Sequence, residues 1–359
     1  MQFSTTLRRV LGAITVAAGM LGSTAGHAGP SFSNLYFFGD SLSDTGNLYT
    51  ATGGPAPNVL DGPPYPQSPS YFEGRFSNGP VWAEYFANAL GLSNDAKAVL
   101  LGGNNLAVGG DTVLVPRPGS TTLQIQLGTY LGLAGGADPN ALYAIMGGTN
   151  DVADMLANPG LQSLIPGDFD LAVAQILGQL GDVINALGQM VVDLYLAGAR
   201  HILLANIPDL ADTPLVQLSP LAGFSPTITQ LSALFGMGID GIDQNATALV
   251  GLDLDVLDLF GLGKAAKANP NLFGFTNVTD PCVVGEPSLN GSGNTCAPGL
   301  YDAAGHLYWD VEHPTTDAHR LIADAALNAV PLPSTLSLVL LALALTGWTL
   351  SRRRAMARF

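Results

Sequence analysis

Charged side chains are scarce in this 359-residue chain, in which only 11% of the residues are Asp, Glu, Lys or Arg. The 13 basic residues are outnumbered by 28 acidic ones, so the formal net charge is −15. Nucleic-acid binding depends on clustered Lys and Arg, and this composition argues against such a partner. CxxC and HExxH motifs and repeats of solenoid length are also absent. We therefore expect a globular protein whose substrate is neutral, or is not bound through net charge.

The first 28 residues have the organisation of a secretory signal peptide. Arg8 and Arg9 form a positive start, residues 10–21 form a short apolar run, and small residues lead to Ala28. This order predicts export with cleavage near Ala28. The alternative, an amphipathic first helix, lacks a polar face.

Cysteine occurs only twice, as Cys282 and Cys296. Two cysteines cannot form a structural zinc site alone. In an exported protein an even number favours a disulfide, with two free thiols as the alternative. The bond would close a loop of about 15 residues and contribute roughly 3 kcal/mol to stability.

Residues 330–359 form a second terminal signal. A Val-Pro-Leu-Pro-Ser segment leads into an apolar run over residues 336–350, which three arginines follow at 352–354. The run is shorter than the ~20 residues that span a bilayer comfortably. Its arginines would stay cytoplasmic. The tail resembles the PEP-CTERM sorting signal of Gram-negative bacteria, which implies export machinery and an exosortase as partners, with transient membrane attachment. An ordinary tail anchor is the alternative.

Between these signals, residues 29–329 alternate short apolar runs with helical periodicity. The runs stop at turn residues, as buried parallel strands do. They cover residues 35–38, 141–146, 201–206 and, more weakly, 99–101. Residues 168–197 repeat apolar side chains at three- and four-residue steps, which predicts a long amphipathic helix. Alternating strands and helices predict a parallel sheet covered on both faces.

A ligand site in such a sheet lies outside the carboxyl ends of the strands. The loops after residues 38, 146 and 206 should therefore converge on one edge. Residues 53–70 are rich in Pro and Gly, which predicts an irregular surface loop. We interpret residues 211–300 as an insertion that could cover the site, rather than as a second domain.

A serine follows the first expected strand directly. Residues 37–47 read Phe-Phe-Gly-Asp-Ser-Leu-Ser-Asp-Thr-Gly-Asn, which would place Ser41 at the sheet edge, near a helix N-terminus. This position suits a nucleophile. The segment is not GxSxG, so an α/β-hydrolase nucleophile elbow is not indicated. The alternative is that Asp40 and Ser41 only cap a helix.

A serine hydroxyl needs a base, and histidine is the usual base near neutral pH. Of five histidines, one falls in the signal peptide and one opens a strand, which leaves His306, His313 and His319. Asp310 lies three residues before His313, close enough to orient its imidazole. A helix from about residue 314 to 326 would contain His319, whose expected role is packing or a side-chain hydrogen bond. A structural role for His313 is the alternative.

Two turns offer hydrogen-bond donors for a developing oxyanion. Residues 147–151, Gly-Gly-Thr-Asn-Asp, follow a strand and place the Asn150 amide at the sheet edge. Residues 104–112 contain a glycine whose backbone N–H can approach a ligand closely. Two such donors and the nucleophile's own N–H make an oxyanion hole. Each turn alone is a weak signal.

Together these segments, in order along the chain, resemble the GDSL family, also called SGNH hydrolases. Residues 39–42 resemble the serine block, residues 148–151 the asparagine block and residues 310–313 the Asp-x-x-His block. Gly110 best matches the family glycine, with Gly109 as the close alternative.

The resemblance implies a flavodoxin-like three-layer α/β/α sandwich with a mostly parallel sheet. It also implies a triad of Ser41, His313 and Asp310, and an oxyanion hole from Ser41, Gly110 and Asn150. No metal or organic cofactor is implied. The expected activity is hydrolysis of lipid or small esters. Alternatives are an acyltransferase or carbohydrate deacetylase with the same triad, and a non-catalytic surface protein that binds matrix polysaccharide.

Overall fold

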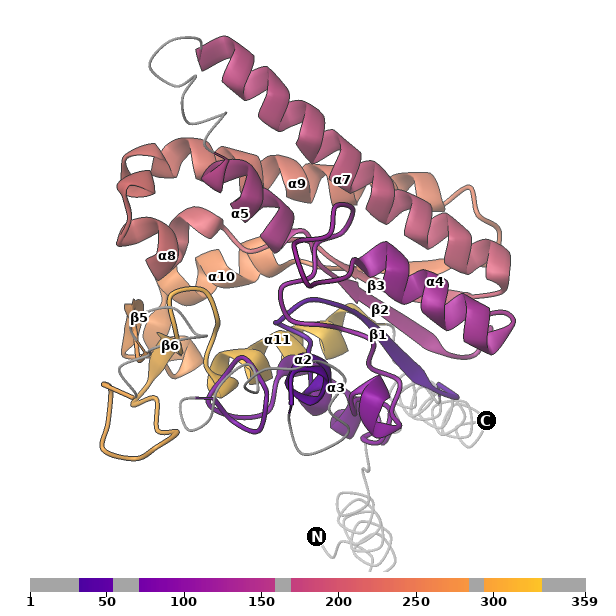
Figure 1. Cartoon of the computed structure of the whole chain (residues 1–359), viewed down its shortest axis with the longest axis horizontal. Coiled ribbons are helices and arrows are strands. Elements are labelled where there is room, and N and C mark those ends of the chain that lie inside the picture. Colours follow the sequence, from indigo (N-terminus) through magenta and orange to yellow (C-terminus); the bar gives the residue numbers. More distant parts are fainter. Residues whose placement is uncertain (1–31, 54–70, 159–168, 284–293, 331–359) are drawn as a thin grey trace, which may run out of the picture. The chain divides into compact units, whose positions relative to one another are not determined.

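Four short strands form a parallel sheet in the order of the sequence (Figure 1). They are β1 (Leu35–Gly39), β2 (Leu142–Met146), β3 (His201–Ala205) and β4 (Asp253–Leu257). The register places Gly39 opposite Met146 and Ala205 opposite Leu257, so the strands end together at one edge. The first three strands lie where their apolar runs predict them.

The computed structural model describes residues 32–53, 71–158, 169–283 and 294–330, and one structural unit runs from Phe32 to Val330. The expected signal peptide, the sorting tail beyond residue 330 and nearly all of the loop at 53–70 lie outside the described residues. The expectations for these segments therefore stay predictions.

Helices cover both faces of the sheet because successive side chains of each strand point in opposite directions. On β2, Tyr143 and Ile145 face one layer, whereas Leu142 and Ala144 face the other. The first layer consists of α4 (Leu123–Ala134), α5 (Thr149–Ala157), α7 (Phe169–Ala197) and α9 (Ser225–Ala246). The second consists of α3 (Trp82–Ala89), α10 (Leu259–Ala268) and α11 (Thr316–Ala329). The expected three-layer α/β/α architecture is confirmed.

Shorter elements connect these layers. The helical turns are α2 (Asn47–Ala51), η1 (Val99–Leu101), η2 (Leu210–Asp212), α8 (Pro214–Gln217), η3 (Pro220–Phe224) and η4 (Pro270–Phe273). A separate two-stranded parallel sheet pairs β5 (Asn277–Pro281) with β6 (His306–Tyr308).

Helix α7 matches the long helix expected from the periodicity. Its inward residues Leu187, Met190 and Leu194 lie in the core beside α9. By length and composition, Val173–Ala197 is also the one described helix that could cross a membrane, but a core helix passes the same test. The packed stripe is what an amphipathic core helix provides.

Two expectations are wrong. Val99–Leu101 forms a 3₁₀ turn instead of a strand, and its side chains are 40–49% exposed. Residues 211–300 belong to the same structural unit, as expected, but they are not an insertion, because they supply α9, α10 and the sheet strand β4. Strand β4 was not predicted because it has no continuous apolar run. It lies at the end of the sheet, where Asp253 and Asp255 alternate with apolar residues.

Candidate active site

Ser41 and Asn150 meet at the carboxyl edge of the sheet because β1 and β2 end side by side. Ser41 lies two residues beyond β1, and Asn150 lies in the first turn of α5, which follows β2. Their exposed fractions are 8% and 6%. The loop after β3 approaches the same place, since Pro208 and Leu210 line a pocket together with Ser41. The loops after the first three strands therefore converge as expected.

A continuous line of hydrogen bonds runs from Ser41 through His313 to Asp310. The Nε2 atom of His313 lies 2.8 Å from Ser41 Oγ, and its Nδ1 atom lies 2.8 Å from Asp310 Oδ2. Asp310 is fully buried and His313 is 5% exposed. Of the described histidines, only His313 bonds to Ser41. In this order, the imidazole can accept the serine proton while the carboxylate fixes its tautomer.

The Asp310 carboxylate is held from three directions. Its Oδ1 accepts the backbone N–H groups of Glu312 at 2.8 Å and His313 at 2.7 Å. The Tyr71 hydroxyl donates to Oδ2 at 2.8 Å, although it lies 239 positions earlier in the chain. Burial opposes the negative charge, but His313 and these backbone donors hold the pKa of Asp310 below its usual value.

The charge on Asp310 acts on the base in turn. Burial alone would lower the pKa of His313, but the adjacent Asp310 carboxylate outweighs burial and raises it above the ordinary imidazole value. Glu312 and Asp40 add to this effect. The arrangement therefore stabilises the imidazolium that forms when His313 takes a proton.

Asp40 shapes the turn that presents Ser41. Its backbone carbonyl accepts the N–H groups of Ser43 and Asp44, both at 3.0 Å, and its Oδ1 accepts that of Leu42 at 3.0 Å. The N–H of Ser41 has no acceptor among the described residues. Burial raises the pKa of Asp40 to about 7, against the lowering effects of the Leu42 N–H and His313. The turn at Asp40 therefore leaves the Ser41 N–H as a donor that no described residue uses.

The two glycines of the neighbouring loop differ in what their N–H groups do. Gly109 donates to Asp44 Oδ2 at 2.9 Å, and a Cβ there would lie only 2.3 Å from the ring of Phe76. Gly110 has a φ of 83°, which glycine adopts readily, and its N–H has no partner in the described part of the chain. This difference favours Gly110 over Gly109 as a donor to a ligand.

The Asn150 amide is oriented by its neighbours. Its Nδ2 donates one hydrogen to the Asp111 carbonyl at 2.8 Å, and its Oδ1 accepts from Arg117 Nη1 at 3.1 Å. An amide nitrogen carries two hydrogens, so one remains for a ligand. The sequence did not predict a role for Arg117. Its one distinguishing feature in the sequence is that basic residues are rare in this chain.

A buried glutamine also escaped the sequence analysis. Gln126 accepts the Gly39 N–H at 2.9 Å and donates to the Gly39 carbonyl at 2.8 Å. Its Nε2 also bonds Asp111 Oδ2 at 2.7 Å. It therefore ties the end of β1 to the loop that carries Gly110, and nothing in its local sequence marks this role.

His319 and the cysteines occupy supporting positions. His319 is fully buried in α11, and neither of its ring nitrogens has a hydrogen-bond partner among the described residues, so packing rather than a side-chain hydrogen bond describes it. A disulfide joins Cys282 to Cys296 and packs beside Trp309, which directly precedes Asp310. His306 lies close to both sulfur atoms, but sulfurs bonded to each other offer no thiolate to a metal.

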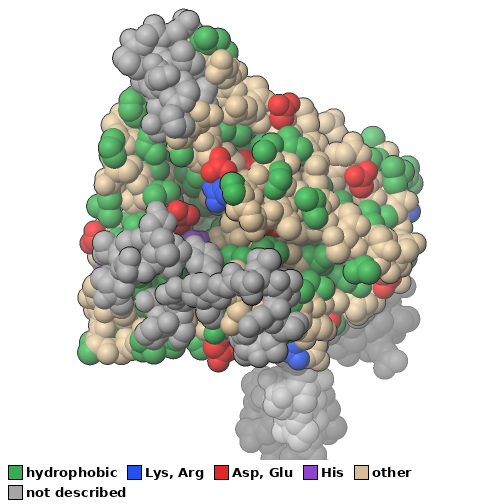
Figure 2. All heavy atoms as spheres, in the orientation of Figure 1, with side chains coloured by type: hydrophobic (Ala, Val, Ile, Leu, Met, Phe, Trp, Pro, Cys, Tyr) green, Lys and Arg blue, Asp and Glu red, His purple; other side chains and the backbone are tan. Residues whose placement is uncertain are grey.

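The surface over the site is mostly hydrophobic or uncharged. Figure 2 shows a described surface that is mostly green or tan, with a hollow that a few red and blue groups border. The pocket beside Ser41 is lined mainly by leucine, isoleucine, alanine and proline side chains. An uncharged ligand fits this environment better than a charged one.

A serine, histidine and carboxylate bonded in this order, at the edge of a parallel sheet, is the arrangement of a serine hydrolase. The model of the GDSL-like lipase/acylhydrolase family matches residues 35–326, so the chain belongs to this family.

Curated relatives carry related names. The chain is 31% identical over 372 residues to esterase EstA of Pseudomonas aeruginosa, covering 90% of this chain and 51% of that protein. It is 29% identical over 308 residues to the thermolabile hemolysin of Vibrio parahaemolyticus, covering 81% and 62%. It is 25% identical over 340 residues to the phosphatidylcholine-sterol acyltransferase of Aeromonas hydrophila, covering 83% and 90%. The chain thus spans only half to three fifths of the first two relatives.

Proposed function

We propose that this protein hydrolyses carboxylic esters, with Ser41 as nucleophile, His313 as base and Asp310 as the carboxylate that orients the base. The observation that carries the proposal is the line of two 2.8 Å hydrogen bonds joining these three side chains. Membership of the lipase/acylhydrolase family and the relatives named esterase support it.

In the first half of the reaction, Ser41 Oγ attacks the ester carbonyl carbon while His313 Nε2 takes its proton. The imidazolium is stabilised by Asp310 and then gives that proton to the leaving alcohol oxygen as the C–O bond breaks. The products of this half are a free alcohol and an acyl group bonded to Ser41.

In the second half, water repeats the attack. His313 takes a proton from the water, the hydroxide bonds to the acyl carbon, and the bond to Ser41 Oγ breaks with return of the proton to the serine. The sum is one ester and one water converted to one acid and one alcohol.

Three donors would hold the oxyanion of each tetrahedral intermediate. They are the backbone N–H groups of Ser41 and Gly110 and the remaining amide hydrogen of Asn150. Their support is that the two backbone N–H groups have no acceptor among the described residues and that the amide is oriented by Arg117. Such donors stabilise charge that develops only during reaction.

The terminal segments extend the proposal to localisation. The signal-like residues 1–28 and the PEP-CTERM-like tail from residue 330 suggest an exported hydrolase, in the periplasm or at the surface of a Gram-negative bacterium, whose tail engages the membrane transiently before an exosortase removes it. Intact-mass analysis of cells and medium tests this. Full-length protein in the cytoplasm with Met1 retained would contradict export.

An acyltransferase is the second candidate, because a relative with that name aligns over most of its length. The same acyl-enzyme would then pass its acyl group to an alcohol instead of water. Product analysis with a p-nitrophenyl ester in the presence of glycerol separates the two, since transfer yields a glycerol ester and hydrolysis yields free acid. A carbohydrate deacetylase would use the same triad, but its substrates would be acetylated sugars.

A fluorophosphonate probe tests the nucleophile directly, because it bonds to an activated serine. We expect labelling of the wild type at Ser41, none of Ser41→Ala, and undiminished labelling of Ser93→Ala, which changes an exposed serine. A folded wild type without labelling would indicate a non-catalytic protein that uses the fold for binding.

A further inference from the structure

The pocket beside Ser41 continues away from the sheet edge between two helices. Helix α10 contributes Leu259, Leu262, Gly263 and Ala266, which lie three and four positions apart and so share one helical face. Helix α11 contributes Ala318, Leu321 and Ile322 with the same spacing. Two amphipathic helices therefore direct apolar faces into a single space that reaches the serine.

The two side-chain hydroxyls in this part of the pocket already donate their hydrogens within the protein. The Thr213 hydroxyl donates to the Leu210 carbonyl at 2.7 Å, and the Tyr308 hydroxyl donates to the Asp212 carbonyl at 3.1 Å. A sugar carries several hydroxyls, and the two side-chain hydroxyls here have already donated their hydrogens, so most of the sugar's hydrogen bonds to water would not be replaced, which costs free energy. An aliphatic chain loses nothing and gains by leaving water.

Gly263 is the position where the wall has no side chain. A Cβ built there meets no heavy atom within 4 Å, although the residue lines the pocket. Glycine in a helix interior is destabilising relative to alanine. Helix stability therefore does not explain a glycine at position 263, whereas the need to keep this part of the pocket open does.

We propose that this pocket receives the acyl chain of the substrate, that the substrates are esters of aliphatic acids longer than acetate, and that Gly263 determines the acceptable chain length. The proposal rests on the proposed ester hydrolysis and names its substrate class. It argues against acetylated sugars, which would leave the apolar pocket unfilled.

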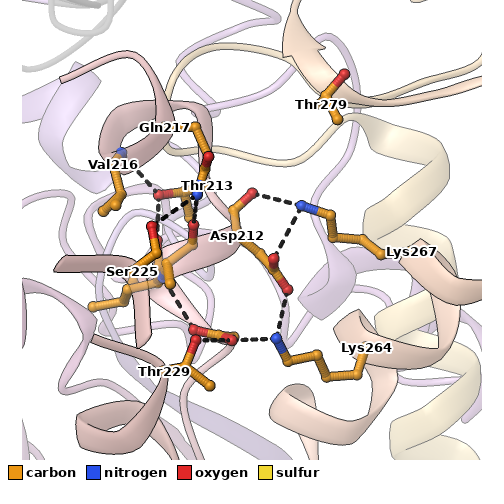
Figure 3. A network of polar contacts seen from close by, with 12 residues as sticks. Asp212, Thr213, Val216, Gln217, Ser225, Thr229, Lys264, Lys267 and Thr279 are labelled. Atoms are coloured by element: carbon orange, nitrogen blue, oxygen red, sulfur yellow. Dashed lines mark hydrogen bonds and ion pairs between the residues drawn. The ribbon is translucent and has the colours of Figure 1, made fainter. Parts of the chain in front are cut away.

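The wall that carries Gly263 is anchored rather than loose. At the start of α10, Asn206 Oδ1 accepts the N–H groups of Leu259 at 2.7 Å and Phe260 at 3.1 Å. Figure 3 shows Asp212 between Lys264 and Lys267, at 2.9 Å and 3.2 Å respectively.

The same network reaches two further elements. Lys264 also pairs with the buried Asp209, which accepts a hydrogen bond from Thr229 of α9 at 2.8 Å. These contacts hold α10 against η2 and α9, so the residue before Lys264 keeps its place in the wall. A wall held in this way can discriminate chain length. A side chain added at residue 263 would shorten the pocket, because the anchored helix does not shift to make room.

Kinetics with p-nitrophenyl esters of acetate, butyrate, octanoate and dodecanoate test the proposal. For the wild type we expect kcat/KM to rise at least about tenfold from acetate to the best chain, since burial of each added methylene is favourable. The series Gly263→Ala, Gly263→Leu and Gly263→Phe should shorten the preferred chain step by step. The ratio of kcat/KM for octanoate to kcat/KM for acetate should fall about tenfold or more in Gly263→Leu and Gly263→Phe. Gly132→Leu, at an exposed glycine of α4 with no heavy atom within 4 Å of a built Cβ, is the matched control and should keep the wild-type ratio.

A second series with acetate esters of increasing alcohol length decides which part of the ester fills the pocket. If the Gly263 variants shift the preferred alcohol length instead of the acyl length, the assignment to the acyl chain is overturned. A wild type that prefers acetate, with a chain-length profile unchanged by Gly263→Leu, overturns the whole proposal.

Binding without turnover separates this inference from the hydrolase function. Methyl octanoate titrated into Ser41→Ala should bind at least about tenfold more tightly than into Ser41→Ala/Gly263→Leu. If that difference is found but the wild type hydrolyses no ester, the assignment of the pocket to the acyl chain is supported and the proposed hydrolysis is wrong. If esters are hydrolysed but neither binding nor chain preference depends on residue 263, hydrolysis stands and the pocket assignment falls.

Discussion

Arg117 donates hydrogen bonds to both oxygens of Asn150. Its Nη1 donates to the side-chain Oδ1 at 3.1 Å, and its Nη2 donates to the backbone carbonyl at 3.2 Å. Asp154 holds the far side of the guanidinium with contacts at 2.8 Å and 2.9 Å. Because Oδ1 accepts from Arg117, the amide nitrogen is placed against the Asp111 carbonyl, and Asn150 lines the pocket beside Ser41. A charged side chain outside the four family segments thus sets the direction of a proposed oxyanion donor.

Replacing Asn150 by alanine should lower kcat on the order of 10²–10³-fold with little change in KM. The reason is that the amide would act on charge present mainly in the transition state. Steady-state kinetics on one p-nitrophenyl ester checks this. An unchanged kcat would make Asn150 a turn residue only.

Arg117→Met should lower kcat about tenfold while KM stays near the wild-type value, because the Asn150 amide would lose its orientation. The effect should disappear in an Asn150→Ala background, where there is no amide to orient. Additive losses in the double variant would show that Arg117 acts independently of Asn150. Arg117→Lys should not restore full activity, since lysine cannot bond two oxygens and a carboxylate in the same geometry.

His313→Ala should reduce kcat by about 10⁴-fold or more, as loss of a triad base does. His319→Ala should chiefly lower the free energy of unfolding, by roughly 1–3 kcal/mol, because it removes a buried side chain that packs in α11. Thermal unfolding and turnover of both variants make the comparison. Near-normal turnover of a folded His313→Ala, with loss in His319→Ala, would reverse the assignment.

The pH dependence follows from the raised pKa of His313. The proposed base, His313, accepts a proton only when neutral, so activity should rise with pH, with a midpoint above the ordinary imidazole value of 6.5. Asp310→Asn removes the charge that raises this pKa, so the His313 titration followed by NMR should move to lower pH. The same variant should lose about 10⁴-fold in kcat because the tautomer is no longer fixed. A titration midpoint that does not move would exclude Asp310 as the cause.

The disulfide supplies a test of stability. Cys282 and Cys296 are separated by 14 positions, and removal of a bond closing a loop of this size costs about 3 kcal/mol in the chain-entropy account. We expect Cys282→Ser/Cys296→Ser to unfold at lower denaturant concentration. Thiol labelling of the denatured, unreduced wild type should find no free thiol, and two labelled cysteines would contradict the bond.

Much of the site could be expected from short segments because its reactive groups follow strand ends. Ser41 comes directly after an apolar run, and Asp310 lies within one turn of His313. Parallel strands end at one edge, so segments far apart in the sequence could be placed together without knowing the helix packing. The three buried strands carried strong signals because their apolar runs are uninterrupted.

The remaining features depend on contacts that no local pattern records. Tyr71 reaches Asp310 across 239 positions, and Gln126 bonds a strand end that lies 87 positions earlier. The end strand β4 was missed because solvent on one side permits acidic residues within it. Gly263 looks like any helix glycine until the empty space in front of it is seen.

The wide separation of the proposed nucleophile and base has a consequence for protein synthesis. Ser41 and His313 are 272 positions apart, and the two segments bond directly. A growing chain leaves the ribosome with Ser41 first, so the serine emerges long before the imidazole that would activate it. During most of translation the hydroxyl would remain an ordinary alcohol that esters do not acylate. The onset of esterase activity should therefore coincide with docking of the 309–313 loop, which makes turnover a reporter of completed folding.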